Sequence, residues 1–318
     1  MADQMTSAET CRACDAPLSN VQFRDGGLCD ECVRRSSANA SEDAPSATVT
    51  YATVGPEPVS GQVPPDPDNP SWGPVTGTMV WLASVAAIIV IPVIAVGMWL
   101  AVQSARGAPL PNFAIRAELE QWALSPGILL LQIVSTIVAH AVTIGICWAM
   151  VTRFGSRPFW ASLGWNWGGR RVWYWIVFSV CVLLAIQIIS QILTRVLPQE
   201  ESPFDQMLKS SQSVRIAVAF LAVFTAPLVE EVVYRGLLFS SLRKRLGLVA
   251  SVLVVTATFA AVHVFQNRGA WVTISSLAFL SLVLTTVRAR TKSLLPCVFI
   301  HTLNNAVASL AILINKGS

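Results

Sequence analysis

Charged residues are scarce in this chain of 318 residues: they make up 13% of the sequence, whereas 53% is hydrophobic. A soluble domain carries about 25% charged residues, so the composition excludes an ordinary soluble protein. Crossing a bilayer takes roughly 20 apolar residues, and we expect spans near 79–103, 127–151, 172–196, 214–239, 248–265, 270–288 and 294–315. The sequence thus predicts an all-α polytopic membrane protein with about seven transmembrane helices, six or eight being the alternatives.

The first 35 residues lack both an apolar run and a cleavage site, so we expect no signal peptide. Residues 1–78 contain four arginines, no lysine and eleven acidic residues; the rest of the chain contains eighteen Lys and Arg but seven acidic residues. The loops expected after the second, fourth and sixth spans are basic: Arg153, Arg157, Arg170 and Arg171; Arg243, Lys244 and Arg245; Arg288, Arg290 and Lys292. The positive-inside rule then predicts that the N-terminus and the basic loops are cytoplasmic. We expect a multi-pass protein of a bacterial inner (cytoplasmic) membrane.

Two Cys-x-x-Cys pairs lie near the N-terminus, at Cys11, Cys14, Cys29 and Cys32. Four thiolates suit tetrahedral zinc and leave no open coordination position, so the pattern predicts a structural zinc in a ribbon-like segment over residues 1–35, with a role in recognition or assembly. A disulfide pair and an unstructured redox tail are the alternatives. Residues 36–78, rich in Pro, Ser and Ala, are predicted to be a linker, and residues 79–318 a helical membrane domain.

Only two acidic residues after residue 78 lie in or beside an apolar run, Glu230 and Glu231. Because an ionised side chain in the bilayer costs roughly 2.5–3.5 kcal/mol even on lenient scales, such residues are candidates for a functional site. Arg235 follows Glu231 at i,i+4 and shares its helical face. Glu230 is rotated from Glu231 by about 100°. We therefore predict that Glu231 and Arg235 form a structural ion pair and that Glu230 faces the bundle interior as a general base.

The three histidines also lie in apolar runs, and two belong to motifs with i,i+4 spacing: Phe259-Ala-Ala-Val-His263 and His301-Thr-Leu-Asn304-Asn305. His263 is a second candidate for the base, while His301 and Asn305 supply donors suited to an oxyanion. As an alternative, each histidine is a packed core residue. His140 matches no motif and is predicted to pack or to form an interhelical hydrogen bond. The zincin motif His-Glu-x-x-His is absent.

The motifs EExxxR, FxxxH and HxxxN, in this order, resemble the CPBP family, which includes the type II CAAX prenyl endopeptidases and the Abi-type bacteriocin-immunity proteins. The resemblance covers residues 214–310. It implies an intramembrane endopeptidase in which Glu230 and His263 activate the attacking water. His301 and Asn305 would stabilise the oxyanion, and Glu231 with Arg235 would hold the site together.

The same resemblance leaves open whether a catalytic zinc takes part. The expected partners are the lipid bilayer and a peptide or membrane-protein substrate, lipidated or not; no nucleic acid is expected. Two other functions remain as alternatives: a non-enzymatic membrane immunity or assembly factor, and a proton-coupled transporter. The sequence shows no inverted repeat and no matching pair of broken helices, which disfavours a transporter.

Overall fold

The computed structural model describes residues 14, 32 and 66–314. The chain divides into two compact units, Met1–Gln62 and Val63–Ser318. The predicted zinc ligands lie in the first unit, and since Cys11 and Cys29 are outside the described residues, the zinc site stays a prediction. Within the described residues the second unit is helical and contains no strand, apart from an isolated antiparallel bridge between Gln199 and Ala270.

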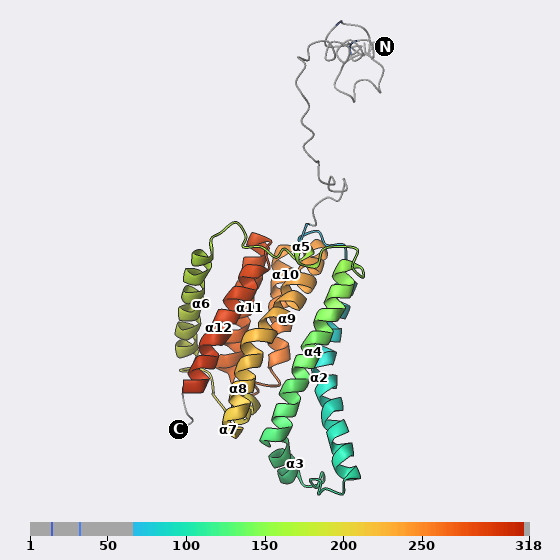
Figure 1. Ribbon diagram of the computed structural model, residues 1–318. Helices are drawn as coiled ribbons and strands as arrows, with labels where there is room; N and C mark the ends of the chain where they lie inside the picture. Colours follow the sequence, from blue (N-terminus) through green and yellow to red (C-terminus); the bar gives the residue numbers. More distant parts are fainter. Residues whose placement is uncertain (1–13, 15–31, 33–65, 315–318) are drawn as a thin grey trace, which may run out of the picture. The chain divides into compact units, whose positions relative to one another are not determined.

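The elements of the second unit follow one another along the chain as a series of helices (Figure 1). They are α2 (Pro74–Ala105), α3 (Arg116–Ala123), α4 (Pro126–Thr152), α5 (Phe159–Ser162), α6 (Val172–Leu193), α7 (Pro203–Ser210), α8 (Gln212–Phe220), the π-helix η2 (Leu221–Thr225), α9 (Ala226–Glu231), the π-helix η3 (Val232–Leu238), α10 (Phe239–His263), α11 (Trp271–Thr291) and α12 (Leu295–Ile314).

Six helical stretches in the described part are long and apolar enough to cross a membrane. One of them, Gln212–His263, has 52 residues. At 1.5 Å per residue it would reach about 78 Å, far beyond the roughly 30 Å of the hydrocarbon core. Gly247 interrupts it with φ 75° and ψ −179°, and residues on opposite sides of this turn meet: the rings of Tyr234 and Phe259 are 5.1 Å apart. The stretch therefore folds into two antiparallel passes, which confirms a multi-pass helical fold and agrees with about seven crossings.

The bundle has a central hairpin with a helix pair on either side. The hairpin consists of α8, α9 and α10 with the two π-helices; α2 and α4 pack against one side of it, and α11 and α12 against the other, with α6 at the outer edge (Figure 1). One apolar core joins η3 to α2, α4 and α10, and a second joins α6 to α11 and α12. The segment from α8 to α10 is thus enclosed on both sides.

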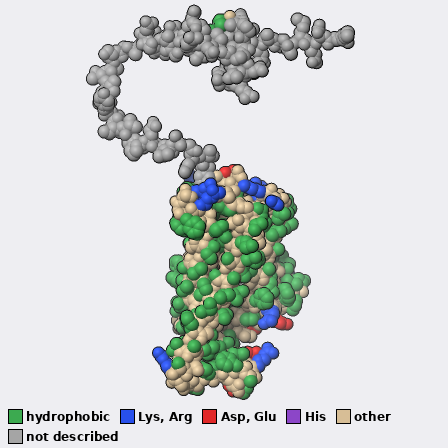
Figure 2. Space-filling view, turned by 90° about the vertical axis from the view of Figure 1, so that its right-hand side faces the viewer, with side chains coloured by type: hydrophobic (Ala, Val, Ile, Leu, Met, Phe, Trp, Pro, Cys, Tyr) green, Lys and Arg blue, Asp and Glu red, His purple; other side chains and the backbone are tan. Residues whose placement is uncertain are grey.

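The basic loops share one end of this bundle. Asp68 forms ion pairs with both Arg243 and Lys292, and the amide of Leu294 donates to the carbonyl of Gly164. Lys and Arg side chains gather at this end of the bundle in the space-filling view, at the top of Figure 2. We call it the basic end. The sequence-based grouping of these loops is confirmed, while their cytoplasmic location stays a prediction.

Close packing of α2 on α10 depends on Gly77. A Cβ atom at this position would overlap Oγ of Ser241 and approach its Cβ to 2.9 Å. We expect Gly77→Ala to lower the free energy of unfolding by about 1–3 kcal/mol, because overpacking forces side chains and backbone to shift. Gly97 on the same helix is the matched control, since nothing lies within 4 Å of its Cβ position. Thermal unfolding in detergent measures both; equal melting temperatures for the two variants would contradict the packing.

Candidate active site

The paired glutamates lie on α9, between the two π-helices. In η2 the amide of Ala226 donates to the carbonyl of Leu221. In the same register the next donor would be residue 227 and its acceptor the carbonyl of Ala222, but Pro227 has no N–H. Asn305 Nδ2 from α12 donates to that carbonyl instead, at 2.9 Å. Pro227 and Asn305 together thus accommodate a register shift just before the glutamates, and π-helical insertions of this kind are frequent at functional sites.

Glu231 and Arg235 form the predicted ion pair, and both side chains are fully buried. Arg235 Nη1 lies 2.7 Å from Glu231 Oε1, with 0% exposure of either side chain. The same oxygen lies 2.8 Å from Nδ1 of His301. A carboxylate paired with arginine accepts hydrogen bonds, so His301 Nδ1 is the donor. Glu231 therefore does more than pair with Arg235: it also fixes the orientation of the His301 ring.

Glu230 has different surroundings from its neighbour. Its side chain is 21% exposed, and its Oε2 lies 3.7 Å from Nε2 of His301. His301, itself buried, is thus held between the two glutamates, with Nδ1 toward Glu231 and Nε2 toward Glu230. The difference in burial agrees with the helical-phase argument that the two acids have separate tasks.

Phe259 links the two histidine motifs. Its ring centre lies 4.9 Å from Cζ of Arg235, 4.8 Å from the ring of His263 and 6.0 Å from the ring of His301. His263 Nδ1 is 2.8 Å from the carbonyl oxygen of Phe259. A carbonyl only accepts, so Nδ1 carries the hydrogen and Nε2 of the neutral ring keeps a free lone pair. No hydrogen bond or ion pair joins His263 to Glu230 within residues 66–314.

The remaining polar residues occupy separate positions. Asn305 lies one turn beyond His301 on α12, and it accepts from Nδ2 of Asn304 at 3.5 Å. His140 on α4 lies with Nδ1 3.0 Å from Oγ1 of Thr225, at the end of η2. The interhelical hydrogen bond predicted for His140 is therefore present, and it holds α4 to the π-helix that precedes the glutamates.

Three residues of α11 that sequence reasoning missed line the same site. Arg235 Nη2 donates to the carbonyl and to Oγ of Ser281, at 3.1 and 2.8 Å, and its Nε to Oγ1 of Thr285, at 3.3 Å. Arg288 follows one turn later and donates to the carbonyl of Arg235 at 3.2 Å. The three are spaced i, i+4 and i+7 and therefore share one face of α11, and this spacing was the signal that could have found them.

Thr285→Val tests this anchoring. Valine keeps the shape of the side chain but leaves a donor of the buried Arg235 guanidinium without an acceptor, so we expect a loss of about 1–3 kcal/mol in the free energy of unfolding. The neighbouring Thr286 is exposed and bonds only within its own helix, to the carbonyl of Leu282. Thr286→Val is therefore expected to unfold like the wild type. Equal stability of the two variants would show that Thr285 does not anchor Arg235.

The donor atoms of this site do not form a metal-binding group. Within residues 14, 32 and 66–314, no three His, Cys, Asp or Glu side chains converge in a way that could hold a metal ion. His301 Nδ1 and Glu231 Oε1 are already bonded to each other.

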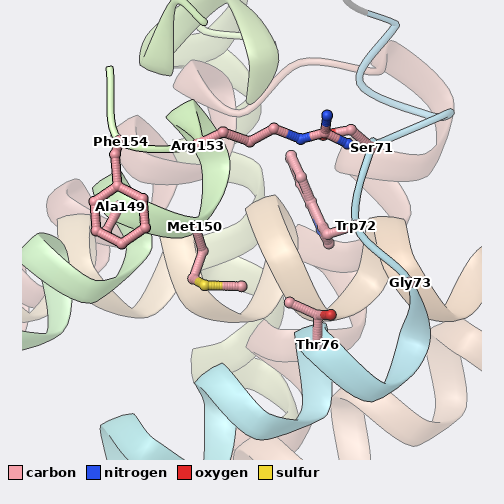
Figure 3. Close-up of a pocket in the computed structure, with 8 residues that line it drawn as sticks. All are labelled: Ser71, Trp72, Gly73, Thr76, Ala149, Met150, Arg153 and Phe154. Carbon is pink, nitrogen blue, oxygen red and sulfur yellow. The ribbon is translucent and has the colours of Figure 1, made fainter. Parts of the chain in front are cut away.

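A hollow of about 290 Å³ lies elsewhere, between the start of α2 and the end of α4 (Figure 3). It is lined by Ser71, Trp72, Gly73, Thr76, Ala149, Met150, Arg153 and Phe154. In Figure 3 the Arg153 side chain extends across it toward Ser71. None of these residues belongs to the three motifs, so the hollow is separate from the candidate active site.

Fold and site together define a polytopic helical membrane protein with a cluster of two glutamates, an arginine and two histidines, of which Glu231, Arg235 and His301 are buried. Residues 212–307 match the family model described as Rce1-like, Type II CAAX prenyl endopeptidase Rce1-like. Residues 212–307 are thus similar to the type II CAAX prenyl endopeptidases of the CPBP family, as the motifs indicated, and that family is one of CAAX-protease-like intramembrane endopeptidases. No curated protein and no solved structure matches the chain.

Proposed function

We propose that this protein is an intramembrane endopeptidase that hydrolyses a peptide bond at or within the bilayer by means of a water molecule activated by Glu230 and His263. The observation that carries the proposal is the position of His301 between Glu230 and Glu231, 3.7 and 2.8 Å away, inside the segment that matches the family. A partly exposed carboxylate beside a buried, oriented imidazole is the arrangement that general acid–base chemistry needs.

Glu230 is the proposed general base. It takes a proton from a water molecule while the water oxygen bonds to the scissile carbonyl carbon, and His263 Nε2 accepts a hydrogen bond from the same water. When the C–N bond breaks, the proton passes from Glu230 to the leaving amine. The products are a carboxylic acid and an amine, whose atoms together equal the substrate plus one water molecule.

His301 and Asn305 are the proposed oxyanion donors. Donation from His301 Nε2 requires the doubly protonated ring, because Nδ1–H is already given to Glu231. With His301 as a cation, the charges of Glu230, Glu231, Arg235 and His301 sum to zero inside the bundle. Asn305 uses one amide hydrogen on Ala222 and keeps a second for the oxyanion. Donors fixed in this way stabilise charge as it develops in the transition state.

The depth of the site bears on the substrate. His301 lies six residues after Leu295, the first residue of α12, which places it about 9 Å along the helix from the basic end. If the basic loops are cytoplasmic, as we propose for a bacterial inner membrane, the site lies in the cytoplasmic half of the bilayer. A peptide or membrane protein approaching from that side, lipidated or not, is the proposed substrate.

The test uses the purified full-length protein in lipid nanodiscs with two probe peptides of equal sequence, one prenylated at a C-terminal CAAX-type cysteine and one unmodified. The expected result is cleavage of at least the prenylated peptide into two products whose masses sum to that of the substrate plus one water, measured by mass spectrometry. Folded protein that leaves both peptides intact would contradict the proposal and favour a non-enzymatic role.

A further inference from the structure

Residues 66–72, which precede α2, lie against the basic end of the bundle, and we call them the strap. Asp68 is its central contact. Its Oδ2 lies 2.8 Å from Nη1 of Arg243 and 3.3 Å from Nζ of Lys292, and the Asp68 side chain is 11% exposed. One carboxylate thus joins the strap both to the hairpin turn of α10 and to the end of α11.

Two further hydrogen bonds hold the strap along its length. Lys244 Nζ donates to the carbonyl of Pro70 at 3.0 Å, and Trp72 Nε1 donates to the carbonyl of Leu237 at 3.3 Å. Trp72 is buried, and Leu237 belongs to η3, the π-helix that carries Arg235. The strap is therefore attached to η3 directly at one end and through α10 and α11 in its middle.

Arg288 lies beneath the strap and connects it to the candidate active site. Its side chain is fully buried; Nη2 donates to the carbonyl of Pro67 at 3.3 Å and Nε donates to the carbonyl of Arg235 at 3.2 Å. Nη1 is buried without a hydrogen-bond partner among the described residues. One guanidinium therefore contacts both the strap and the residue whose side chain holds Glu231.

A buried guanidinium is stable only where its charge is compensated and its donors are bonded. Arg288 has no carboxylate within hydrogen-bond distance in the described part of the chain. The carboxylates that act favourably on its charge are Asp68 and Asp66 on the strap, whereas Arg243 acts against it. Release of the strap would remove this compensation together with the carbonyl of Pro67 and admit water to Arg288. The guanidinium could then bond to water, and its hydrogen bond to the carbonyl of Arg235 would no longer be favoured.

We propose that Asp68 and Arg288 are positioning residues for the reaction: the docked strap holds Arg288 against the carbonyl of Arg235 and thereby keeps η3 in the conformation that aligns Glu231 with His301. Neither residue belongs to the three motifs, and Asp68 also lies outside the segment matched to the family. The effect on turnover rests on the proposed function, whereas the coupling between the strap and η3 does not.

The test combines steady-state kinetics with hydrogen–deuterium exchange of the full-length protein in nanodiscs. Asp68→Asn is expected to speed exchange in residues 66–72 and in η3, and to lower kcat about 10-fold with little change in KM, because small displacements of catalytic groups cost up to about 10²-fold. Arg288→Met is expected to speed exchange in η3 and to lower kcat by up to about 10²-fold. The charge-swapped double variant, Asp68→Arg with Arg243→Asp, is expected to recover part of the kcat that is lost in Asp68→Arg alone or in Arg243→Asp alone.

Glu120→Gln is the matched control, since Glu120 pairs with Arg116 at 2.7 Å while 59% exposed, far from both strap and motifs in sequence. This substitution should change neither the hydrogen–deuterium exchange nor kcat. Faster exchange in the strap of Asp68→Asn, with η3 exchange and kcat unchanged, would overturn the proposal. If the wild type cleaves neither probe peptide, the proposed function fails, and exchange alone decides the coupling: faster exchange in η3 of Asp68→Asn supports it, and unchanged exchange rejects it.

Discussion

Replacement of Arg235 by methionine is expected to lower the free energy of unfolding by about 3–5 kcal/mol, because removing one partner of a buried ion pair leaves an uncompensated charge. Glu231 would remain fully buried with only His301 as a partner for Oε1, while its Oε2 already lacks one in the described structure. Ser281 and Thr285 would also lose their donor. Titration of the purified protein with a denaturing detergent in mixed micelles measures the difference.

The double variant Glu231→Gln with Arg235→Met provides the internal control for charge. It removes both charges, so we expect it to recover part of the stability lost in Arg235→Met. Replacing a buried ion pair by two neutral side chains costs far less free energy than leaving one charge buried without its partner. Arg116→Gln, in an exposed ion pair at 2.7 Å, should unfold like the wild type. If Arg235→Met were as stable as Arg116→Gln, the buried ion pair could not be what holds the site together.

Much of the candidate site could be predicted from the sequence because its parts are local. Glu231 and Arg235 lie one helical turn apart, and an i,i+4 pair meets on any regular helix. The side chains of Glu230 and Glu231 point in different directions on any helix, and this difference predicted that they lie in separate environments. The assignment of His301 to the neighbourhood of the glutamates rested on the resemblance to the CPBP family, and its contact with Glu231 at 2.8 Å agrees with it.

The contacts that the sequence did not reveal are those between distant segments. In the sequence, Ser281 and Thr285 look like ordinary residues of an apolar span and Arg288 like part of a basic loop. Only the packing of α11 against η3 turns the three toward Arg235. Residues 66–72 read as the end of a Pro-rich linker. Asp68 lies against the bundle because Arg243 and Lys292, far apart in sequence, meet at the same end.

His263 lies on the part of α10 that follows the turn at Gly247, where the sequence predicted a span to begin near residue 248. The structure begins the descending helix at Gly247, with Phe259 level with Arg235 and His301, and His263 one turn further from the basic end. The two π-helices were also absent from the expectations. The first of them, η2, is followed by Pro227 and accepts a hydrogen bond from Asn305, a residue of another helix.

The largest effect on activity is expected for Glu230→Gln. Glutamine keeps the size of the side chain but cannot take a proton from water, and loss of a general base lowers rates by about 10²–10⁴-fold. Stability should change little, because Glu230 is partly exposed and its ion-pair contact with His301 is long, at 3.7 Å. Glu231→Gln makes the contrasting variant: its side chain is fully buried and holds both Arg235 and His301, so we expect it to lose stability as well as activity.

The rate of peptide cleavage per folded molecule in Glu230→Gln, measured beside the wild type in the same nanodiscs, tests the account most directly. With a melting temperature close to that of the wild type, the variant should cleave at least about 10²-fold more slowly, while Glu120→Gln cleaves normally. Folded Glu230→Gln that cleaves the probe peptide at the rate of the wild type would contradict the assignment of Glu230 as the base.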